Sequence, residues 1–407
     1  MNALIDQLPK MLMGDKLIEE LQEIPEYSSD IRCLDSASRL TKLSELYGLY
    51  IPSSMTMEIY SKLYLGILQS LQKKTTKLAI QQRYKNYQML LGNKCNGIIG
   101  GSDSFTIIGC SGIGKSSAVM NSIKVATNCQ ILTNESPYME VIPCLIVQCP
   151  FDCSVKSLLL NILLQVDNVL QTEYHQRAIK THATTDMLIS SVSQVSINHI
   201  GLLIIDEIQN VSRNKGGVNL VSMLTQLINS SGISVCMVGT PECTSFFERE
   251  MQLARRSLGL KYSALPFDDY FIRFCETIFT YQYVKEFTPI TDGIIHWLYE
   301  HSSGVISVVV SLVHDAQEIA IMNGFEKLDL STLNLAYKER MKMLHRYISP
   351  SSLPETAIIR KTKEKIVESP SADPSFNLYE IAMRAKEKKM NVVECLKQYV
   401  SIEEVAI

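Results

Sequence analysis

The stretch Gly109-Cys-Ser-Gly-Ile-Gly-Lys-Ser116 decides the fold of this chain of 407 residues. It has the form G-x-x-x-x-G-K-[ST], and the apolar run at 104–109 predicts a short buried strand directly before it. A helix is expected from Lys115 to about residue 125. This pattern between a strand and a helix predicts a P-loop, whose backbone N–H groups surround phosphates. The alternative, a glycine-rich turn with an accidental Lys-Ser pair, does not account for these flanks.

The motif gives each residue type a role in holding a triphosphate. Glycines let backbone N–H groups turn toward a phosphate without a Cβ in the way, and the helix begins with its positive dipole end facing that group. Lys115 is expected to reach the β- and γ-phosphates, and Ser116 Oγ to hold Mg²⁺. The predicted nucleotide-binding residues are Gly109, Cys110, Ser111, Gly112, Ile113, Gly114, Lys115, Ser116 and Ser117.

A second apolar run, Leu202-Leu-Ile-Ile-Asp206-Glu207, ends in two acids. An uninterrupted apolar run suits a parallel strand that is buried on both faces. Two carboxylates at its carboxyl end are costly unless a cation or hydrogen-bond donors meet them. In P-loop enzymes the first acid supports Mg²⁺ and an adjacent Glu polarises the attacking water. We therefore expect Asp206 to serve the metal and Glu207 to act as general base of a nucleoside triphosphatase.

Strands alternate with helices across residues 103–268, which predicts βαβ units and a parallel sheet. The expected fold class is α/β, a P-loop core whose sheet is flanked by helices, followed by a small all-helical lid at 269–347. Further strands are expected at 141–148, 233–240 and 258–266, and further helices at 154–170, 185–195 and 218–229.

Two positions after the acidic strand carry alternatives that the sequence leaves open. Thr240 ends a predicted strand, where ligands of open α/β sheets bind, so its hydroxyl can hold the attacking water or the γ-phosphate. Thr240-Pro241-Glu242 also suits a helix start with Thr240 as N-cap. Arg255 and Arg256 are either an ordinary surface pair or a source of an arginine finger, which reaches a neighbouring subunit's γ-phosphate.

The N-terminal 102 residues are expected to be a helical segment that contains a basic stretch. No acid occurs from Ser61 to Ser102, where seven Lys and Arg residues alternate with tyrosines. Such a stretch can lie along nucleic-acid phosphates, which are bound mainly by charge. The alternative is a solvated helix face whose partners are acids elsewhere in the fold.

The regions after the core are expected to differ from it. The lid is helical throughout, with Trp297 on an apolar face and therefore expected in its core. Residues 348–407 are polar and contain the linker signal Glu368-Ser-Pro-Ser-Ala-Asp-Pro374, so we expect a linker and a tethered tail that can act as a docking peptide.

Composition describes an ordinary globular protein, with 46% hydrophobic and 20% charged residues and a net charge of −3. That balance does not indicate a nucleic-acid binder, although a local patch can outweigh it. The eleven cysteines include no C-x-x-C pair with zinc spacing, and we expect Cys144, Cys149 and Cys153 to be buried free thiols rather than metal ligands. With no signal peptide evident and no apolar run long enough to cross a bilayer, the expected location is the cytoplasm and no membrane contact is expected.

The chain resembles AAA+ proteins, and more narrowly the TnsC/TniB-type ATPases of Tn-family DNA transposons. The resemblance rests on the P-loop, on Asp206-Glu-Ile-Gln-Asn210 after its apolar strand, and on Val238-Gly-Thr-Pro-Glu242 followed by Arg255 and Arg256. It covers roughly residues 50–325.

The resemblance implies an ATPase that binds ATP and Mg²⁺ and regulates DNA transposition. Members assemble head-to-tail on double-stranded DNA, as a ring or helical filament, and link a target-selection protein to the transposase. A finger from Arg255 or Arg256 would make that assembly nucleotide-dependent. Lys156, Arg177 and Lys180 are the residues expected to follow the DNA backbone, although ordinary surface charge explains any single one of them.

One departure concerns the lid. AAA+ lids often carry Gly-x-x-Arg at a helix start, with the arginine on the γ-phosphate, whereas Gly304-Val-Ile-Ser307 has serine there. Either another residue senses the phosphate or hydrolysis is slow, which favours a regulatory switch over a fast motor.

Other functional classes remain open. A signalling NTPase of the STAND-like type would bind protein partners without nucleic acid. A replication-initiator-like loader would normally add a DNA-reading domain such as a winged helix, and a helicase would carry further motor motifs.

Overall fold

The computed structural model describes residues 3–74, 76–90, 104–135, 138–213, 216–244 and 259–344. The chain divides into two compact units, Met1–Ser352 and Leu353–Ile407. The second unit and the whole of the expected tail at 348–407 lie outside the described residues.

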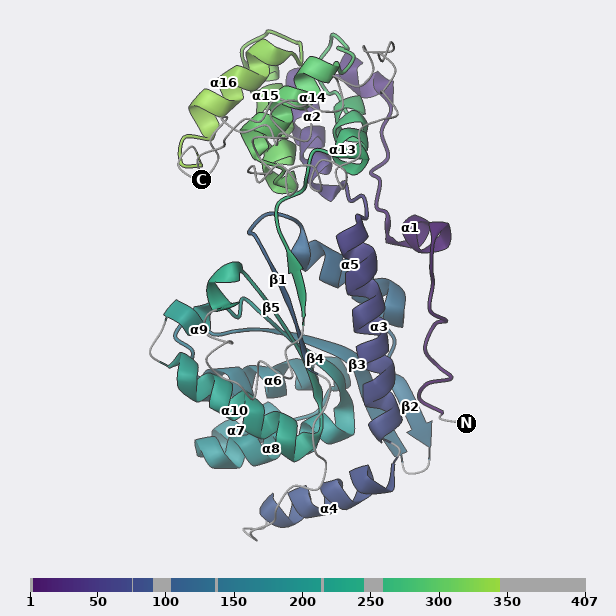
Figure 1. Ribbon diagram of the computed structural model, residues 1–407, viewed down its shortest axis with the longest axis vertical. Helices are drawn as coiled ribbons and strands as arrows, with labels where there is room; N and C mark the ends of the chain where they lie inside the picture. Colours follow the sequence, from purple (N-terminus) through teal and green to yellow (C-terminus); the bar gives the residue numbers. More distant parts are fainter. Residues whose placement is uncertain are drawn as a thin grey trace, which may run out of the picture. The chain divides into compact units, whose positions relative to one another are not determined.

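A six-stranded sheet forms the centre of that unit, with the order β2-β3-β4-β5-β1-β6. The strands pair in parallel except for β2, which runs antiparallel to β3 at the edge (Figure 1). Their bounds are β1 Phe105–Gly109, β2 Leu132–Glu135, β3 Tyr138–Gln148, β4 Ile200–Asp206, β5 Ser234–Gly239 and β6 Leu260–Tyr262.

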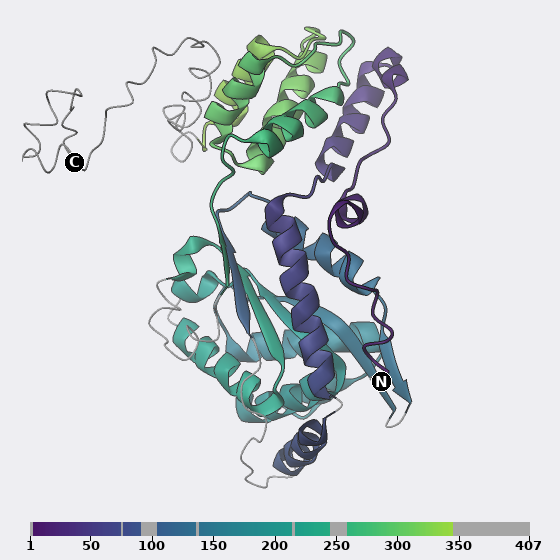
Figure 2. The same ribbon diagram turned by 45° about the vertical axis from the view of Figure 1, so that its right-hand side comes forward.

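Helices cover both faces of the sheet, because its central strands are apolar on both sides. Along β4, Leu202 and Ile204 enter one apolar core, and Leu203 and Ile205 enter the other. The first core is completed by α3 (Ser54–Lys74) and α5 (Lys115–Thr127). The second is completed by α6 (Val155–Leu170), α8 (Thr185–His199) and α10 (Gly217–Ser231), so three layers result (Figures 1 and 2).

Shorter elements connect or extend these layers. They are α1 Asp15–Leu21, α2 Ser36–Leu43, α4 Lys77–Leu90, α7 Tyr174–Lys180 and α9 Asn210–Arg213, with 3₁₀ helices η1 Ser29–Cys33, η2 Ser44–Gly48 and η3 Pro241–Cys243. The C-terminal part of the unit is helical, as expected, with α13 Asp269–Thr280, α14 Asp292–Ser302, α15 Ile306–Met322 and α16 Leu330–Arg340.

The predicted fold class, an α/β P-loop core whose sheet is flanked by helices and followed by a helical lid, is confirmed. Strand β2, which runs antiparallel to β3, was not predicted, because its sequence Leu-Thr-Asn-Glu lacks the apolar run by which the other strands were recognised. As an edge strand with mostly exposed side chains, β2 does not need such a run.

A segment from the N-terminal region belongs to the lid. Helix α2 packs against α15, and the Arg39 side chain, fully buried, donates to both carboxylate oxygens of Glu326 at 2.6 Å. Arg39 also donates to the carbonyl oxygen of Tyr283 at 2.9 Å. Because the guanidinium is paired in a planar, two-bond geometry, it can be buried without an uncompensated charge.

The basic stretch after Ser61 turns partly inward. Lys74 is buried and donates to the carbonyl oxygens of Ser196 and Ile197, in the last turn of α8, at 2.8 and 2.7 Å. Tyr60 and Tyr64 are buried in the core shared by α3 and α5. Neither alternative drawn from the sequence describes these residues, because they face backbone carbonyls and apolar side chains rather than phosphates or acids.

The single tryptophan is not a core residue of the lid. Trp297 is partly exposed and stacks on His301, with ring centroids 3.8 Å apart, while Tyr337 meets both rings edge-on. Among the described residues no single helix is long and apolar enough to cross a bilayer; α14 and α15 reach that length only as a pair bent by 118°.

Candidate nucleotide-binding site

The loop between β1 and α5 has the form that a phosphate cradle needs. Gly112 and Gly114 adopt positive φ angles of 80° and 92°, a region that residues with a Cβ rarely enter. The Lys115 ammonium folds back onto the loop and donates to the carbonyl oxygens of Gly109 and Cys110, both at 2.7 Å. Burial lowers the pKa of Lys115, and the nearby Asp206 carboxylate partly opposes that effect. A buried cation held by neutral carbonyls suits a site that receives an anion.

Ser116 and Asp206 lie together, although they are far apart in the sequence. Ser116 Oγ donates to Asp206 Oδ2 at 3.2 Å, and Asp206 Oδ1 accepts the backbone N–H of Glu207 at 2.8 Å. A hydroxyl and a carboxylate on one side of a cavity supply hard oxygen ligands of the kind that Mg²⁺ prefers, with room for water and phosphate oxygens to complete its shell. The donor set therefore fits the predicted metal.

Beyond Asp206 the chain turns sharply, and that turn carries Glu207. Glu207 has a φ of 58°, unusual for a residue with a side chain. Its carboxylate oxygen Oε2 accepts from Gln209 Nε2, and Gln209 Oε1 accepts the backbone N–H of Thr240 at 3.2 Å. Gln209 thus connects the turn after β4 to the end of the neighbouring strand β5. Gln209 was not among the predicted site residues, although it lies within the run Asp206–Asn210.

Thr240 does not cap a helix with its side chain. It precedes η3, yet its hydroxyl makes no capping hydrogen bond. Oγ1 is buried and has no hydrogen-bond partner among the described residues. A buried hydroxyl without a hydrogen-bond partner lowers the stability of the protein by about 1 to 3 kcal/mol. A ligand oxygen that accepted a hydrogen bond from this hydroxyl would recover that free energy.

These side chains surround one polar cavity of about 290 Å³. The structure brings together Lys115, Ser116, Asp206, Glu207 and Thr240, as the sequence predicted. The cavity is lined by Ser111, Gly112, Gly114, Lys115, Ser116, Ser117, Asp206, Glu207, Gln209, Gly239, Thr240 and Ser307.

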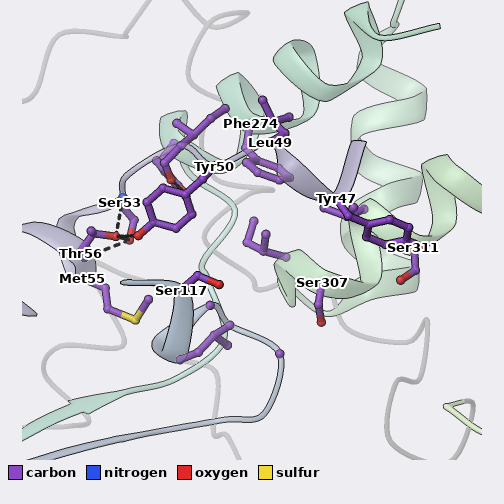
Figure 3. Close-up of a pocket in the computed structure, with 17 residues that line it drawn as sticks. Tyr47, Leu49, Tyr50, Ser53, Met55, Thr56, Ser117, Phe274, Ser307 and Ser311 are labelled. Atoms are coloured by element: carbon purple, nitrogen blue, oxygen red, sulfur yellow. Dashed lines mark hydrogen bonds between the residues drawn. The ribbon is translucent and has the colours of Figure 1, made fainter. Parts of the chain in front are cut away.

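An apolar cavity of about 220 Å³ (Figure 3) adjoins the polar one. The two share Gly112, Gly114, Ser117 and Ser307 in their walls. The remaining wall comes from three places: the segment before and at the start of α3 (Tyr47, Leu49, Tyr50, Ile51, Ser53, Met55 and Thr56), the P-loop residue Ile113, and the lid helices α13 and α15 (Tyr270, Phe274, Ile306, Val310 and Ser311). A flat apolar group joined to a polyphosphate fits this pair of cavities.

Two tyrosines fix the segment that lines the apolar cavity. The Tyr50 hydroxyl lies 2.8 Å from Thr56 Oγ1, and the Tyr270 hydroxyl donates to the carbonyl oxygen of Ile51 at 2.8 Å. Burial raises the pKa of Tyr50 to about 12 and also raises the pKa of Tyr270, so both phenols stay neutral. This cavity was not predicted, since its only signal in the sequence is the aromatic run 47–51 before Pro52.

Ser307, the residue in place of the expected lid arginine, touches the P-loop. Its backbone N–H donates to the carbonyl oxygen of Gly112 at 3.1 Å, and it lines both cavities. A Cβ on Gly112 would lie only 2.3 Å from Ser307 Oγ. The first turn of α15 therefore rests directly on the phosphate loop.

The other predicted site residues stand elsewhere or cannot be placed. Arg255 and Arg256 lie outside the described residues. Lys156, in the first turn of α6, and Arg177 and Lys180, on α7, are exposed. Arg177 is 3.6 Å from Glu173 on its own helix, an exposed ion pair that contributes little to stability.

Cys144, Cys149 and Cys153 form no disulfide bonds. Cys149 and Cys153 are buried and Cys144 partly so. Burial raises the pKa of Cys149 to about 12, which makes it a poor nucleophile and metal ligand at neutral pH. Within the described residues, the one group of His, Cys, Asp or Glu with ligand atoms close enough for a metal is His314, Asp315 and Glu318, far from these thiols in sequence.

Comparison with known proteins identifies the domain that carries this site. Residues 99–247 match the family model described as an AAA domain, a nucleotide-binding domain of the ATPase type. No protein of curated function matches the chain in sequence. The AAA part of the expected resemblance is therefore confirmed for these residues, and the narrower resemblance to TnsC/TniB-type regulators stays a prediction.

Solved structures with a similar fold are distant in sequence. The ORC1 protein of Aeropyrum pernix in complex with DNA is 16% identical over 81% of this chain and 78% of that chain, with a TM-score of 0.42. The ORC2 protein of Aeropyrum pernix, in ADPNP and ADP complexes, is 15% identical over 79% and 78%, with a TM-score of 0.39. Drosophila ORC bound to DNA is 14% identical over 98% and 86%, with a TM-score of 0.44. Similarity at this level identifies neither an activity nor a partner for this chain.

Proposed function

We propose that this chain, whose residues 99–247 match an AAA domain, is an ATP-dependent regulator of DNA transposition that assembles on double-stranded DNA. In this proposal the ATP-bound form oligomerises head-to-tail and recruits or activates the transposase. The observation that carries the nucleotide part is the convergence of Lys115, Ser116, Asp206, Glu207 and Thr240 on one polar cavity beside an apolar one.

Each cavity holds a different part of the ATP molecule. The apolar cavity receives the nucleoside, since an aromatic base gains from burial against Tyr47, Leu49 and Val310. The polar cavity receives the triphosphate, with Lys115 moving from its carbonyl partners to the β- and γ-phosphates. Mg²⁺, when bound by Ser116 Oγ and Asp206, supplies neutralising charge on the phosphate oxygens.

Hydrolysis then needs a base and an oriented water. A water oxygen forms a bond to the γ-phosphorus while the bond to the β,γ-bridging oxygen breaks, which yields ADP and inorganic phosphate. Glu207 accepts the proton that the water loses and later passes it to solvent or phosphate. The free hydroxyl of Thr240 is placed to donate to the γ-phosphate or to hold the water. Because Ser307 occupies the position of the lid arginine, no lid cation is supplied there, and we expect slow, regulatory turnover.

The DNA part of the proposal rests on sequence resemblance. Its support is the run Asp206–Asn210 and the run Val238–Glu242, together with exposed basic residues on the helices that follow β3. We propose that Lys156, Arg177 and Lys180 contact the backbone without reading base sequence. Arg255 or Arg256 is proposed as the finger that joins neighbouring subunits.

Sedimentation of the full chain with a duplex and a non-hydrolysable ATP analogue tests assembly. The expected result is large DNA-bound oligomers with the analogue and none without it. The Glu207→Gln variant should assemble with ATP itself, because it keeps nucleotide binding and blocks turnover. Unchanged phosphate release by this variant would show that Glu207 is not the general base.

Replacing Arg255 and Arg256 together by Ala should leave monomer ATP binding intact and weaken assembly, so undiminished oligomers would contradict the finger. Nucleotide-dependent oligomers that form equally well without DNA, and do not bind it, would instead favour the signalling NTPase.

A further inference from the structure

The Gln209 side chain links Glu207 to Thr240, the residue that directly follows strand β5. Its amide is buried, with 6% of the residue exposed. One end donates to the Glu207 carboxylate and the other accepts the backbone N–H of Thr240. Glu207 and Thr240, which directly follow two neighbouring strands, therefore share one rigid planar group.

The chemistry of the partners fixes which way this amide points. A carboxylate can only accept a hydrogen bond, and a backbone N–H can only donate one. Rotating the amide by half a turn would place its oxygen against the Glu207 carboxylate and its NH₂ group against the Thr240 N–H. Both contacts would then be repulsive, so only one orientation satisfies the partners.

The backbone around the amide leaves it little freedom. A Cβ on Gly239 would lie 2.9 Å from Gln209 Oε1 and 2.8 Å from Ile208 Cγ2, so this side chain fits only against a glycine. The turn that carries it is held by Asn210 Nδ2, which donates to the carbonyl oxygen of Cys149 at 3.1 Å. The amide is thus fixed at both ends and packed from the side.

We propose that Gln209 is a positioning residue that orients Glu207 for catalysis and couples it to Thr240 at the end of β5. This inference rests on the proposed ATP hydrolysis and adds a residue to it. The amide holds Glu207 Oε2, which leaves Oε1 to face the attacking water. A shift of Thr240 toward the γ-phosphate would move the amide, and through it the base.

Two substitutions of Gln209 distinguish the effects of its two hydrogen bonds, and a third substitution serves as the control. Gln209→Met keeps the length of the side chain and removes both bonds. Gln209→Glu keeps an oxygen for the Thr240 N–H but replaces the donor to Glu207 with a like charge. Asn210→Leu is the matched control, because it loosens the same turn without removing either bond of Gln209.

The first readout is steady-state ATP hydrolysis with a separate measurement of nucleotide affinity. Both Gln209 variants should lose roughly 10- to 100-fold in kcat, a loss of the size found when a hydrogen-bond partner that orients a metal ligand is removed. The Kd for ATP of Gln209→Met should stay within about threefold of the original, because the phosphate-holding groups are untouched. Gln209→Glu should bind ATP more weakly, since it adds a carboxylate to the wall of the triphosphate cavity. Asn210→Leu should lower the melting temperature and lower kcat by clearly less than Gln209→Met does, because both bonds of Gln209 remain.

The second readout is hydrogen exchange in the nucleotide-free protein, which does not depend on activity. The Thr240 amide should exchange faster in Gln209→Met, which lacks its acceptor, and remain protected in Gln209→Glu. A third comparison uses Glu207→Gln, where adding Gln209→Met should cause no further loss of kcat, because the base that Gln209 orients is already gone.

The outcomes separate this inference from the proposed function. If the original chain does not release phosphate from ATP, the proposed function fails. If it does, and Gln209→Met retains full kcat or exceeds the original, the positioning role is wrong. Loss of kcat in Asn210→Leu equal to that in Gln209→Met would likewise overturn it, since any damage to the turn would then suffice.

Discussion

The backbone N–H of Ser307 donates to the carbonyl oxygen of Gly112 at 3.1 Å, so the lid helix α15 rests on the phosphate loop itself. Gly112 permits this contact in two ways: its φ of 80° suits glycine, and the absence of a Cβ leaves space for Ser307. The lid and the loop that holds phosphate are therefore in direct contact, so a displacement of one shifts the other.

Gly112→Ala should destabilise the nucleotide-free protein more than Gly114→Ala. Both glycines have positive φ, which costs a residue with a Cβ roughly 1 to 2 kcal/mol. A Cβ on Gly114 meets nothing within 4 Å, whereas one on Gly112 would lie 2.3 Å from Ser307 Oγ. Thermal unfolding of the two variants measures the difference, which we expect to reach about 1 kcal/mol or more.

The double variant Gly112→Ala with Ser307→Gly provides the control. Removing the Ser307 side chain should recover part of that extra loss, because the closest contact disappears. Equal melting temperatures for the two single variants would show that the lid does not rest on Gly112 in solution.

Lys115→Ala should abolish nucleotide binding while leaving the fold intact. Its ammonium is the buried cation closest to the P-loop carbonyls, and its loss removes the charge that attracts the triphosphate. We expect ATP affinity to fall at least about 100-fold, as when a charge-assisted contact of roughly 3 kcal/mol is lost. Calorimetric titration measures the affinity, and persistent tight ATP binding would refute the P-loop assignment.

Val310→Phe should weaken ATP binding by filling the apolar cavity. Val310 lies on α15 and lines the cavity of about 220 Å³ but not the polar one. We expect at least a tenfold loss of ATP affinity, about 1.4 kcal/mol, while the affinity for inorganic tripolyphosphate stays unchanged. Met322→Phe, at an exposed position of the same helix, is the control for added bulk. Parallel losses for ATP and tripolyphosphate would place the nucleoside elsewhere.

Lys74 should give the protein a stability that rises with pH in the alkaline range. Burial lowers the pKa of Lys74 well below 10.5, and Arg83 adds to that effect. Between the lowered folded value and the unfolded value near 10.5, the unfolded chain binds more protons, so the free energy of unfolding increases with pH. The slope is at most about 1.4 kcal/mol per pH unit for one group.

Urea unfolding across that pH range tests this slope. Lys74→Met should remove its part of the slope, whereas Lys77→Met, at an exposed position three residues on, should not. An unchanged slope in Lys74→Met would mean that Lys74 is not buried in solution.

The sequence predicted the parts of the site that depend on local patterns. The P-loop and the strand ending at Asp206 are recognisable because each combines an apolar run with a fixed set of polar residues. Placing Thr240 beside them followed from the rule that ligands of parallel sheets bind at the carboxyl ends of strands. These predictions needed no knowledge of distant contacts.

The features that were missed depend on contacts between distant segments. The apolar cavity is formed by residues 47–56 together with α13 and α15. No local sequence pattern predicts that these distant segments come into contact. Lys74 and Tyr64 look like surface groups in a basic stretch, yet their partners are backbone atoms of Ser196 and Pro9. Strand β2 was missed because an edge strand needs no apolar run. Trp297 pairs with His301 one helical turn away and remains partly exposed.

Binding to a labelled random-sequence duplex, measured with and without a non-hydrolysable ATP analogue across a salt series, tests the central claim most directly. The account predicts cooperative binding that requires the analogue and weakens steeply as salt rises, because phosphate contacts release counterions. Absence of binding in both nucleotide states would contradict the role on DNA and leave a nucleotide switch that acts on protein partners.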